Sequence, residues 1–334
     1  MKLLIITEAN EKIASGHLME SIALARRAMQ EKQEVLLAVN DNICMEWKYF
    51  LNGIPIVWYE YNLDMGMITI QNCLVSKEIE LVITDVRELK EYQVKKIRSN
   101  YNGKVVCLDE WGNRELLCDV IVNNMISSYF WKYGNSNAKL YCGPQYLMLK
   151  DALQIYHRKE KKNRENIEKV VISMGGVDPQ NHTMAILQHL VKISYIQKID
   201  VVLGGGYEYE TELRELYGSD SRIQIHRNID YLYDLFLEDD LAFSAGGNTL
   251  YEMASIGIPS IIVPTMEHEK VNGYAFQKEG YGILLDENNL EHMEKTVLSM
   301  TYEKRNQISK IGKQLIDGMG TTRVWSIIKD TAKG

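Results

Sequence analysis

The sequence has few cysteines, and they lie far apart. The five are an odd number and include no C-x-x-C pair: Cys44, Cys73, Cys107, Cys118 and Cys142. This spacing excludes a disulfide framework and a zinc site, because both need cysteines in paired positions. We therefore expect reduced thiols in a cytoplasmic protein that holds no metal.

Long apolar runs and an excess of basic residues are also missing. No run approaches the roughly 20 apolar residues of a membrane-spanning helix. The first run reaches Glu8 too soon for a signal peptide. A net charge of −7 argues against a general nucleic-acid binder, which carries a strongly basic surface. A length of 334 residues with 46% hydrophobic residues suits a soluble protein of two domains.

Three common motifs of nucleotide and hydrolase chemistry do not occur. A dinucleotide site needs G-x-G-x-x-G after a strand, and Gly204-Gly205-Gly206 lacks that spacing. The glycine turns lack the lysine of a P-loop, and the G-x-S-x-G of serine hydrolases is absent. We therefore expect no cofactor and no serine nucleophile.

Short runs rich in Val and Ile alternate with helical segments along the whole chain. This pattern predicts an α/β protein with parallel sheets that are covered on both faces. The strands are expected near 3–7, 34–39, 55–59, 81–84, 105–108, 120–123, 140–142, 170–174, 200–204, 222–226, 241–243, 260–263 and 282–285. The helices are expected near 18–30, 88–100, 181–193, 210–216, 231–236, 249–255, 270–278 and 291–299.

A charged segment divides this pattern into two halves. Residues 156–168 are dense in charge and lack an apolar face, which favours a linker between domains at 1–155 and 169–302. The tail, 303–334, predicts amphipathic helices that can pack back on the first domain. Ligands of open parallel sheets bind at the carboxyl ends of the strands. We therefore expect two Rossmann-like domains that face each other across a cleft and hold a nucleotide-linked small molecule.

Two glycine-rich turns mark the expected ligand edge of the second domain. Ser244, Gly246, Gly247 and Asn248 lie between a strand and a helix that ends at Gly257. The first amides of such a helix point outward, and its dipole favours a diphosphate. Glu252, further along this helix, can accept hydrogen bonds from ribose hydroxyls.

The second turn contains Gly175 and Gly176, which let a ligand approach the backbone closely. It precedes a helix that Asp178 can cap, with Pro179 at the first helical position. Either turn alone also fits a simple strand–helix connection without a ligand.

A third turn, Ala14-Ser15-Gly16-His17, follows the first strand and opens a helix. His17 is the candidate for proton transfer, because imidazole titrates near pH ~6.5. The helix N-terminus favours the neutral base, whereas Glu20 favours the charged form, and the sequence leaves this balance open.

Acidic and polar residues follow several other strands. Asp85 ends one strand, and Asp109 and Glu110 end the next; each can orient His17 or bind a sugar hydroxyl, or else serve as a helix cap or loop acid. In the second domain, His268 and Asn272, with Glu267, can contact a sugar or phosphate or form a capped loop. Other histidines, such as His182, His189 and His226, are scattered along the chain.

The three turns, in this order and spacing, resemble the UDP-sugar hydrolase family of pseudaminic acid biosynthesis. The matching segments are A-S-G-H, I-S-M-G-G-V-D-P and S-A-G-G-N-T-L-Y-E, together with Gly143-Pro144-Gln145-Tyr146 and Lys150. The resemblance covers nearly the whole chain. That family acts on UDP-2,4-diacetamido-2,4,6-trideoxy-β-L-altropyranose, and its wider group includes spore-coat polysaccharide proteins.

The resemblance implies a GT-B architecture with UDP bound mainly by the second domain. It implies that His17 helps water attack the anomeric carbon. The strand-end acids Asp85 and Asp109 are the residues that we expect to assist His17. From the resemblance and the strand-end positions together, the residues expected in substrate binding are Gly16, Glu20, Tyr146, Lys150, Gly175, Gly176, Ser244, Gly246, Gly247, Asn248, Glu252, His268 and Asn272.

The sequence departs from the family at two positions. Glu20 stands where the family has arginine in G-H-x-x-R, and Lys150 stands where it often has arginine. The exact sugar therefore stays open. Two alternatives stay open as well: a GT-B glycosyltransferase that uses a UDP-sugar donor, and a non-catalytic nucleotide-sugar-binding protein.

Overall fold

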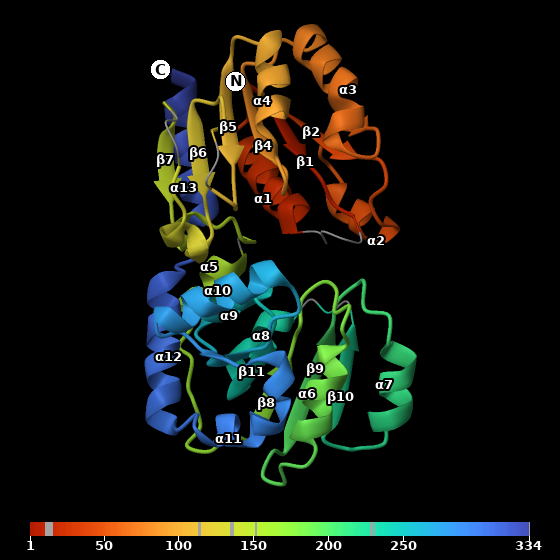
Figure 1. The fold of residues 1–334 in the computed structure, drawn as a ribbon, viewed down its shortest axis with the longest axis vertical. Helices are drawn as coiled ribbons and strands as arrows, with labels where there is room; N and C mark the ends of the chain where they lie inside the picture. The colour runs from red at the N-terminus through yellow and green to blue at the C-terminus, as the bar shows by residue number, and fades with distance from the viewer. Residues whose placement is uncertain are drawn as a thin grey trace. The chain divides into compact units, whose positions relative to one another are not determined.

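The computed structural model describes residues 1–10, 16–112, 115–133, 137–150, 152–227, 229 and 231–333. The chain forms two compact units (Figure 1). The first unit comprises Met1–Asp151 and Gly318–Gly334, and the second comprises Ala152–Asp317.

The first unit is built on a parallel sheet of seven strands in the order β3-β2-β1-β4-β5-β6-β7. All seven strands lie where the sequence predicts them: β1 Lys2–Thr7, β2 Glu34–Asn40, β3 Ile56–Tyr59, β4 Leu81–Asp85, β5 Lys104–Leu108, β6 Val120–Asn123 and β7 Lys139–Cys142. Central strands such as β1 are apolar on both faces because helices cover both sides of the sheet.

Alternate residues of β1 enter two different cores. Leu3 packs with α1 and α13, and Leu4 packs with α3 and α4. The helices of this unit are α1 Gly16–Gln30, α2 Met45–Lys48, α3 Leu63–Ser76, α4 Glu91–Ser99 and α13 Gly320–Lys333, with short 3-10 turns η1 Tyr49–Leu51, η2 Ile126–Phe130 and η3 Pro144–Tyr146. The C-terminal helix α13 therefore belongs to the core of the first unit, and Trp325 anchors it there.

The second unit contains a parallel sheet of six strands in the order β10-β9-β8-β11-β12-β13. These strands also confirm the sequence pattern: β8 Lys169–Ile172, β9 Lys198–Leu203, β10 Ile223–Arg227, β11 Leu241–Ser244, β12 Ser260–Ile262 and β13 Ile283–Leu284. The helices are α5 Ala152–Arg158, α6 His182–Leu190, α7 Glu210–Tyr217, α8 Leu232–Glu238, α9 Asn248–Ile256, α10 Glu267–Lys278, α11 Met293–Leu298 and α12 Tyr302–Leu315, with the turn η4 Glu287–His292.

The start of α6 differs from the expectation. The prediction that Pro179 is the first helical residue is wrong, because α6 begins at His182 after Asn181 adopts a left-handed backbone with φ 53°. Asp178 nevertheless caps the helix: its carboxylate accepts hydrogen bonds from the amides of His182 at 2.9 Å and Thr183 at 2.8 Å. The other end of a predicted helix is confirmed at Gly257, where φ is 89° after α9.

The charged segment 156–168 is bonded to the second unit. The Lys161 Nζ donates to the Asp239 carbonyl at 2.6 Å, and Arg164 Nη1 donates to Asp240 Oδ1 at 3.0 Å. Arg305 of α12 donates in turn to the Arg164 carbonyl at 2.8 Å. Side chains of this segment therefore bond to the two residues before β11, and its backbone accepts a bond from α12.

Each sheet reverses its strand order at one point. In the first unit, β1 to β3 extend the sheet to one side and β4 to β7 extend it to the other. In the second unit, β8 to β10 extend the sheet to one side and β11 to β13 to the other. Ligands of open α/β sheets bind at the carboxyl ends of the strands beside such a reversal. His17 follows β1, and Asp85 ends β4. Gly175 follows β8.

Candidate functional site

His17 and Asp85 form a bonded pair at the reversal point of the first sheet. His17 lies in the first turn of α1, and its Nδ1 is 2.8 Å from Oδ1 of Asp85, the last residue of β4. Ser21, one turn further along α1, donates its hydroxyl to the other carboxylate oxygen at 2.8 Å. Asp85 therefore fixes the ring, and only Nε2 remains for exchange with a ligand or water. Gly16 opens α1, whereas Ala14 and Ser15 of the same motif lie outside the described residues.

Two further carboxylates lie close to the imidazole. Oε2 of Glu110, which follows β5, is 3.7 Å from His17 Nε2. Glu20 is buried on α1 and accepts a hydrogen bond from Asn124, which follows β6, at 2.5 Å. Burial works against the charged imidazole, but Glu110, Asp85 and Glu20 outweigh it and raise the pKa of His17 to about 10. The neighbouring carboxylates therefore favour the charged form of His17, which is the direction that the sequence assigns to Glu20.

Asp109 serves a different set of partners. Its Oδ2 accepts hydrogen bonds from the Gly112 amide and from the Tyr133 hydroxyl, both at 2.8 Å. Burial and the Asp109 charge raise the pKa of Tyr133. Asp109 thus holds the turn after β5, and its neighbour Glu110 contacts His17. The sequence predicts both Asp109 and Glu110 as candidates. Only the structure shows that Glu110 is the one that lies next to His17.

The matching segment before the second unit contains two more of the expected site residues, Tyr146 and Lys150. Tyr146, in η3, packs edge-on against Tyr141 with 5.8 Å between ring centroids. Lys150 is exposed at the end of this segment of the first unit.

The turn after β8 packs on a third glycine segment. Gly175 has φ 89°, which favours glycine, and the space where a side chain would start is open. A Cβ on Gly204 would overlap the carbonyl oxygen of Gly175, and the amide of Gly206 donates to the Gly176 carbonyl at 2.9 Å. The glycines after β9 therefore support this turn by close backbone contact.

The turn after β11 is built against α10. A Cβ on Gly246 would lie 2.6 Å from the carbonyl oxygen of Glu269, so only glycine fits without a shift. Asn272 Nδ2 donates to the Gly246 carbonyl at 3.1 Å. Gly247 precedes α9, whose first residue is Asn248. The backbone thus presents a helix N-terminus, the arrangement that favours phosphate.

A buried hydroxyl lies beside this helix start. Ser244 ends β11 and is 1% exposed, and within the described part of the chain its Oγ has no hydrogen-bond partner. An unsatisfied buried hydroxyl costs free energy, so a ligand oxygen here would stabilise it. Glu252, in the second turn of α9, is half-buried and accepts a hydrogen bond from the Tyr233 hydroxyl at 2.8 Å.

The start of α10 contains a residue that sequence reasoning missed. Glu269 Oε2 accepts hydrogen bonds from the Thr265 hydroxyl at 2.7 Å and from the Thr265 and Met266 amides at 2.9 and 3.1 Å. A capping box has Ser or Thr three residues before its glutamate, and this chain has Met266 there, so the usual sequence signal is incomplete. His268, the neighbour of Glu269, is half-buried in the first turn of α10. Asn272, further along α10, donates its side-chain hydrogen bond to the Gly246 carbonyl.

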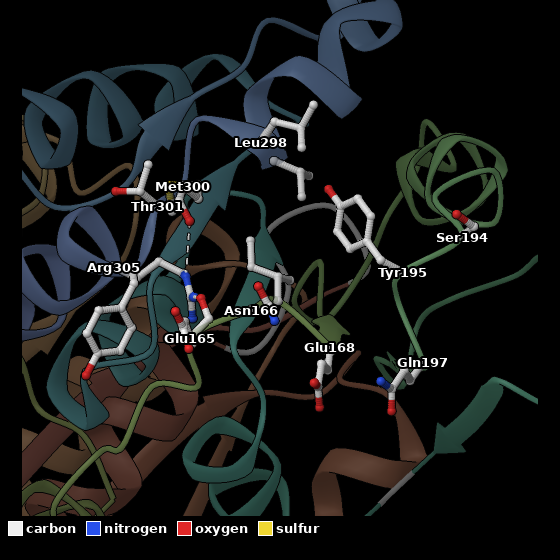
Figure 2. A pocket seen from close by; sticks show the side chains of 13 residues that line it. Glu165, Asn166, Glu168, Ser194, Tyr195, Gln197, Leu298, Met300, Thr301 and Arg305 are labelled. Atoms are coloured by element: carbon white, nitrogen blue, oxygen red, sulfur yellow. Dashed lines mark hydrogen bonds between the residues drawn. The ribbon is translucent and has the colours of Figure 1, made fainter.

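A cavity of about 630 Å³ lies near the amino-terminal ends of β8 and β9, whereas the glycine turns follow the carboxyl ends of their strands (Figure 2). Its lining comes from the segments that precede β8 and β9 and from the start of α12. Arg305 lines it and donates from Nε to the Met300 carbonyl at 3.1 Å. This cavity therefore contains none of the glycine turns.

The described ranges lack both a metal-ligating cluster and a membrane-spanning helix. These residues contain no group of three or more His, Cys, Asp or Glu side chains suited to a metal ion. None of their helices combines the length and the apolar character that crossing a membrane requires.

Residues 151–321 match the glycosyltransferase family 28 C-terminal domain. The chain belongs to this family. Spore coat polysaccharide biosynthesis protein SpsG of Bacillus subtilis is 24% identical over 265 residues, which are 76% of this chain and 78% of that protein. The UDP-N-acetylglucosamine–N-acetylmuramyl-(pentapeptide) pyrophosphoryl-undecaprenol N-acetylglucosamine transferase of Bacillus pumilus is 26% identical over 182 residues. That match spans half of this chain and 49% of the transferase.

The solved structure of MurG from Acinetobacter baumannii has the same fold. It superposes with a TM-score of 0.70 over 99% of this chain and 100% of that chain, at 13% identity. The likeness confirms the predicted GT-B fold. The chain is thus a GT-B member of a nucleotide-sugar-handling family and a distant relative of SpsG.

Proposed function

We propose that this protein is a nucleotide-sugar hydrolase that releases UDP from a UDP-linked amino-deoxy sugar. The proposed substrate is UDP-2,4-diacetamido-2,4,6-trideoxy-β-L-altropyranose or a related sugar of nonulosonic acid or surface polysaccharide biosynthesis. The observation that carries this proposal is the His17–Asp85 pair, bonded at 2.8 Å at the carboxyl ends of β1 and β4. A buried imidazole that is hydrogen-bonded to a carboxylate is a suitable group for exchanging a proton with the reacting water or with the leaving diphosphate oxygen.

In this proposal the second unit binds the nucleotide. The turns at Gly175–Gly176 and Gly246–Gly247 supply backbone amides and a helix start for the diphosphate. The buried Ser244 hydroxyl, which has no partner in the described structure, supports an oxygen-rich ligand at the same edge. Glu252 binds the ribose, and the hydrogen bond from the Tyr233 hydroxyl holds the Glu252 side chain in place.

The first unit takes the sugar and the water. The water oxygen forms a bond to the anomeric carbon, while the bond from that carbon to the diphosphate oxygen breaks and its electron pair leaves on UDP. Glu20, in place of the family's arginine, is bonded to Asn124, and the His17–Asp85 contact persists beside it. This departure therefore leaves the catalytic pair intact.

A glycosyltransferase is the second candidate, and family membership favours it. A transferase would use a hydroxyl of an acceptor where the hydrolase uses water. The two candidates differ in one requirement, which is the need for an acceptor.

The test is an incubation with UDP-2,4-diacetamido-2,4,6-trideoxy-β-L-altropyranose and, separately, UDP-N-acetylglucosamine, without any acceptor. We expect UDP release from the first, and His17→Ala should lower it at least about 100-fold. UDP affinity, measured by calorimetry, should change little, because the nucleotide site lies in the second unit. Release only after an acceptor is added would favour the transferase. UDP binding without turnover on either sugar would favour a binding protein.

A further inference from the structure

We propose that Tyr233 is a positioning residue that makes the nucleotide site selective for a ribonucleotide, because its hydroxyl orients the Glu252 carboxylate towards the 2′-hydroxyl of the ribose. This inference rests on the nucleotide site of the proposed function and adds the class of nucleotide that the site accepts. It favours a sugar linked to UDP over a sugar linked to a 2′-deoxynucleoside diphosphate.

The position of Glu252 on α9 suits a ribose. Gly247 precedes this helix and Asn248 is its first residue, so the diphosphate is expected at this end. Glu252 comes four residues after Asn248, on the same face of the helix and about 6 Å further along its axis. In a nucleotide the ribose is joined directly to the diphosphate, so its hydroxyls would lie beside the second turn of α9.

A hydrogen bond from a buried tyrosine fixes the Glu252 side chain. The Tyr233 hydroxyl, on α8, donates to Glu252 Oε1 at 2.8 Å. Tyr233 is 8% exposed, and burial and the Glu252 charge raise its pKa, so its hydroxyl keeps the proton that it donates. An ionised carboxylate accepts several hydrogen bonds through its two oxygens. A bond from Tyr233 and bonds from ribose hydroxyls are therefore compatible.

The Tyr233 ring is itself held by its neighbours. Tyr156, on α5, packs edge-on against it with 5.3 Å between ring centroids, and the Phe236 centroid lies at 6.3 Å. The hydroxyl of Tyr156 donates to a different carboxylate, that of Asp234, at 2.9 Å. A ring clamped in this way orients the Glu252 carboxylate before a ligand arrives, which lowers the entropy cost of binding.

The chemistry of the ribose explains the expected selectivity. A 2′-hydroxyl donates a hydrogen bond to the held carboxylate, whereas a 2′-deoxyribose presents only C–H groups there. Glu252 is half-buried, so binding a deoxynucleotide would remove water from the carboxylate without supplying that hydrogen bond. Sites built around a ligand hydroxyl reject an analogue that lacks it for this reason. Without the Tyr233 hydroxyl the carboxylate can turn away, and the distinction should shrink.

The test compares UDP with 2′-deoxyuridine 5′-diphosphate, which differs only in the 2′-hydroxyl. Calorimetry of the wild-type chain should give a Kd at least about tenfold lower for UDP. In Tyr233→Phe the ratio of the two Kd values should fall to about threefold or less, while the Kd of the deoxy compound stays within a few-fold of wild type. Tyr156→Phe is the matched control, because it removes a hydroxyl from the neighbouring ring and should keep the wild-type ratio.

Several results would overturn the proposal. Equal affinity of the wild type for the two compounds would mean that the site does not read the 2′-hydroxyl. A wild-type ratio in Tyr233→Phe would mean that this hydroxyl does not orient Glu252. An equal loss of affinity for both compounds in Tyr233→Phe, or the same fall of the ratio in Tyr156→Phe, would show a general structural role instead.

The fate of the hydrolase function is separate from these results. Failure of the wild type to bind either nucleotide would reject the nucleotide site and the proposed function together. The expected selectivity without release of UDP from the sugar would reject hydrolysis and leave the role of Tyr233 standing. Where hydrolysis occurs, Tyr233→Phe should raise KM several-fold and keep kcat within about twofold, because the ribose contact is the same in the bound substrate and in the transition state.

Discussion

The charge on His17 predicts a specific loss of stability at alkaline pH. The perturbation is the substitution His17→Gln, compared with wild type from pH 6.5 to pH 11. The folded protein raises the pKa of His17 from 6.5 to about 10, because three carboxylates outweigh the effect of burial. A raised pKa contributes stability that is complete below pH 6.5 and is lost as the pH rises through 10.

The magnitude follows from the two pKa values. Each pH unit between 6.5 and 10 removes roughly 1.4 kcal/mol, which gives a total on the order of 5 kcal/mol for a side chain that is 8% exposed. His17→Gln lacks this titration, so the wild type should lose this amount relative to the variant over the same range.

The chain offers a selective probe for this measurement. Its five tryptophans all lie in the first unit, where His17 is: Trp47, Trp58, Trp111, Trp131 and Trp325. Urea unfolding followed by tryptophan fluorescence therefore reports the unit that contains the titrating group. If the stability difference between wild type and His17→Gln is the same at pH 6.5 and pH 11, the reasoning about the carboxylates around His17 is refuted.

Three other predictions concern the second unit and the C-terminal helix. Gly246→Ala places a Cβ 2.6 Å from the Glu269 carbonyl oxygen and should raise the Kd for UDP at least about tenfold by calorimetry; an unchanged Kd would remove this turn from the nucleotide site. Trp325→Ala should lower the free energy of unfolding of the first unit by about 3–5 kcal/mol, measured by circular dichroism in urea, because Trp325 is 1% exposed; a loss below about 1 kcal/mol would contradict its core position. Asp178→Ala removes the cap of α6 and should cost about 1–2 kcal/mol in thermal unfolding; Asp178→Asn should cost less, and the reverse order would contradict the capping role.

The sequence predicts the sheets well because local composition decides them. Runs such as Leu81–Asp85 are buried, and their Val and Ile residues suit a strand that is packed on both faces. Helix α3 shows the limit. Its sequence contains Gly66, which weakens a helix, and the reason for that glycine is tertiary: a Cβ there would meet the ring of Tyr59.

The candidate site is predictable only as far as its residues are marked by local sequence. The glycine turns and His17 stand next to their strands in the sequence. The state of His17 depends on Asp85 and Glu110, which lie 68 and 93 residues further along the chain. These acids lie close to His17 only because β4 lies beside β1 and β5 lies beside β4 in the sheet. Local sequence patterns do not give the order of the strands in the sheet. The charge on His17 could therefore not be predicted from the sequence.

The most direct test of the proposed hydrolysis is the fate of the water oxygen. The reaction with UDP-2,4-diacetamido-2,4,6-trideoxy-β-L-altropyranose is run in ¹⁸O-labelled water without an acceptor, and both products are analysed by mass spectrometry. Attack of water on the anomeric carbon predicts one ¹⁸O atom in the free sugar and none in UDP. Label in UDP, or no release of UDP until an acceptor is added, would contradict the account.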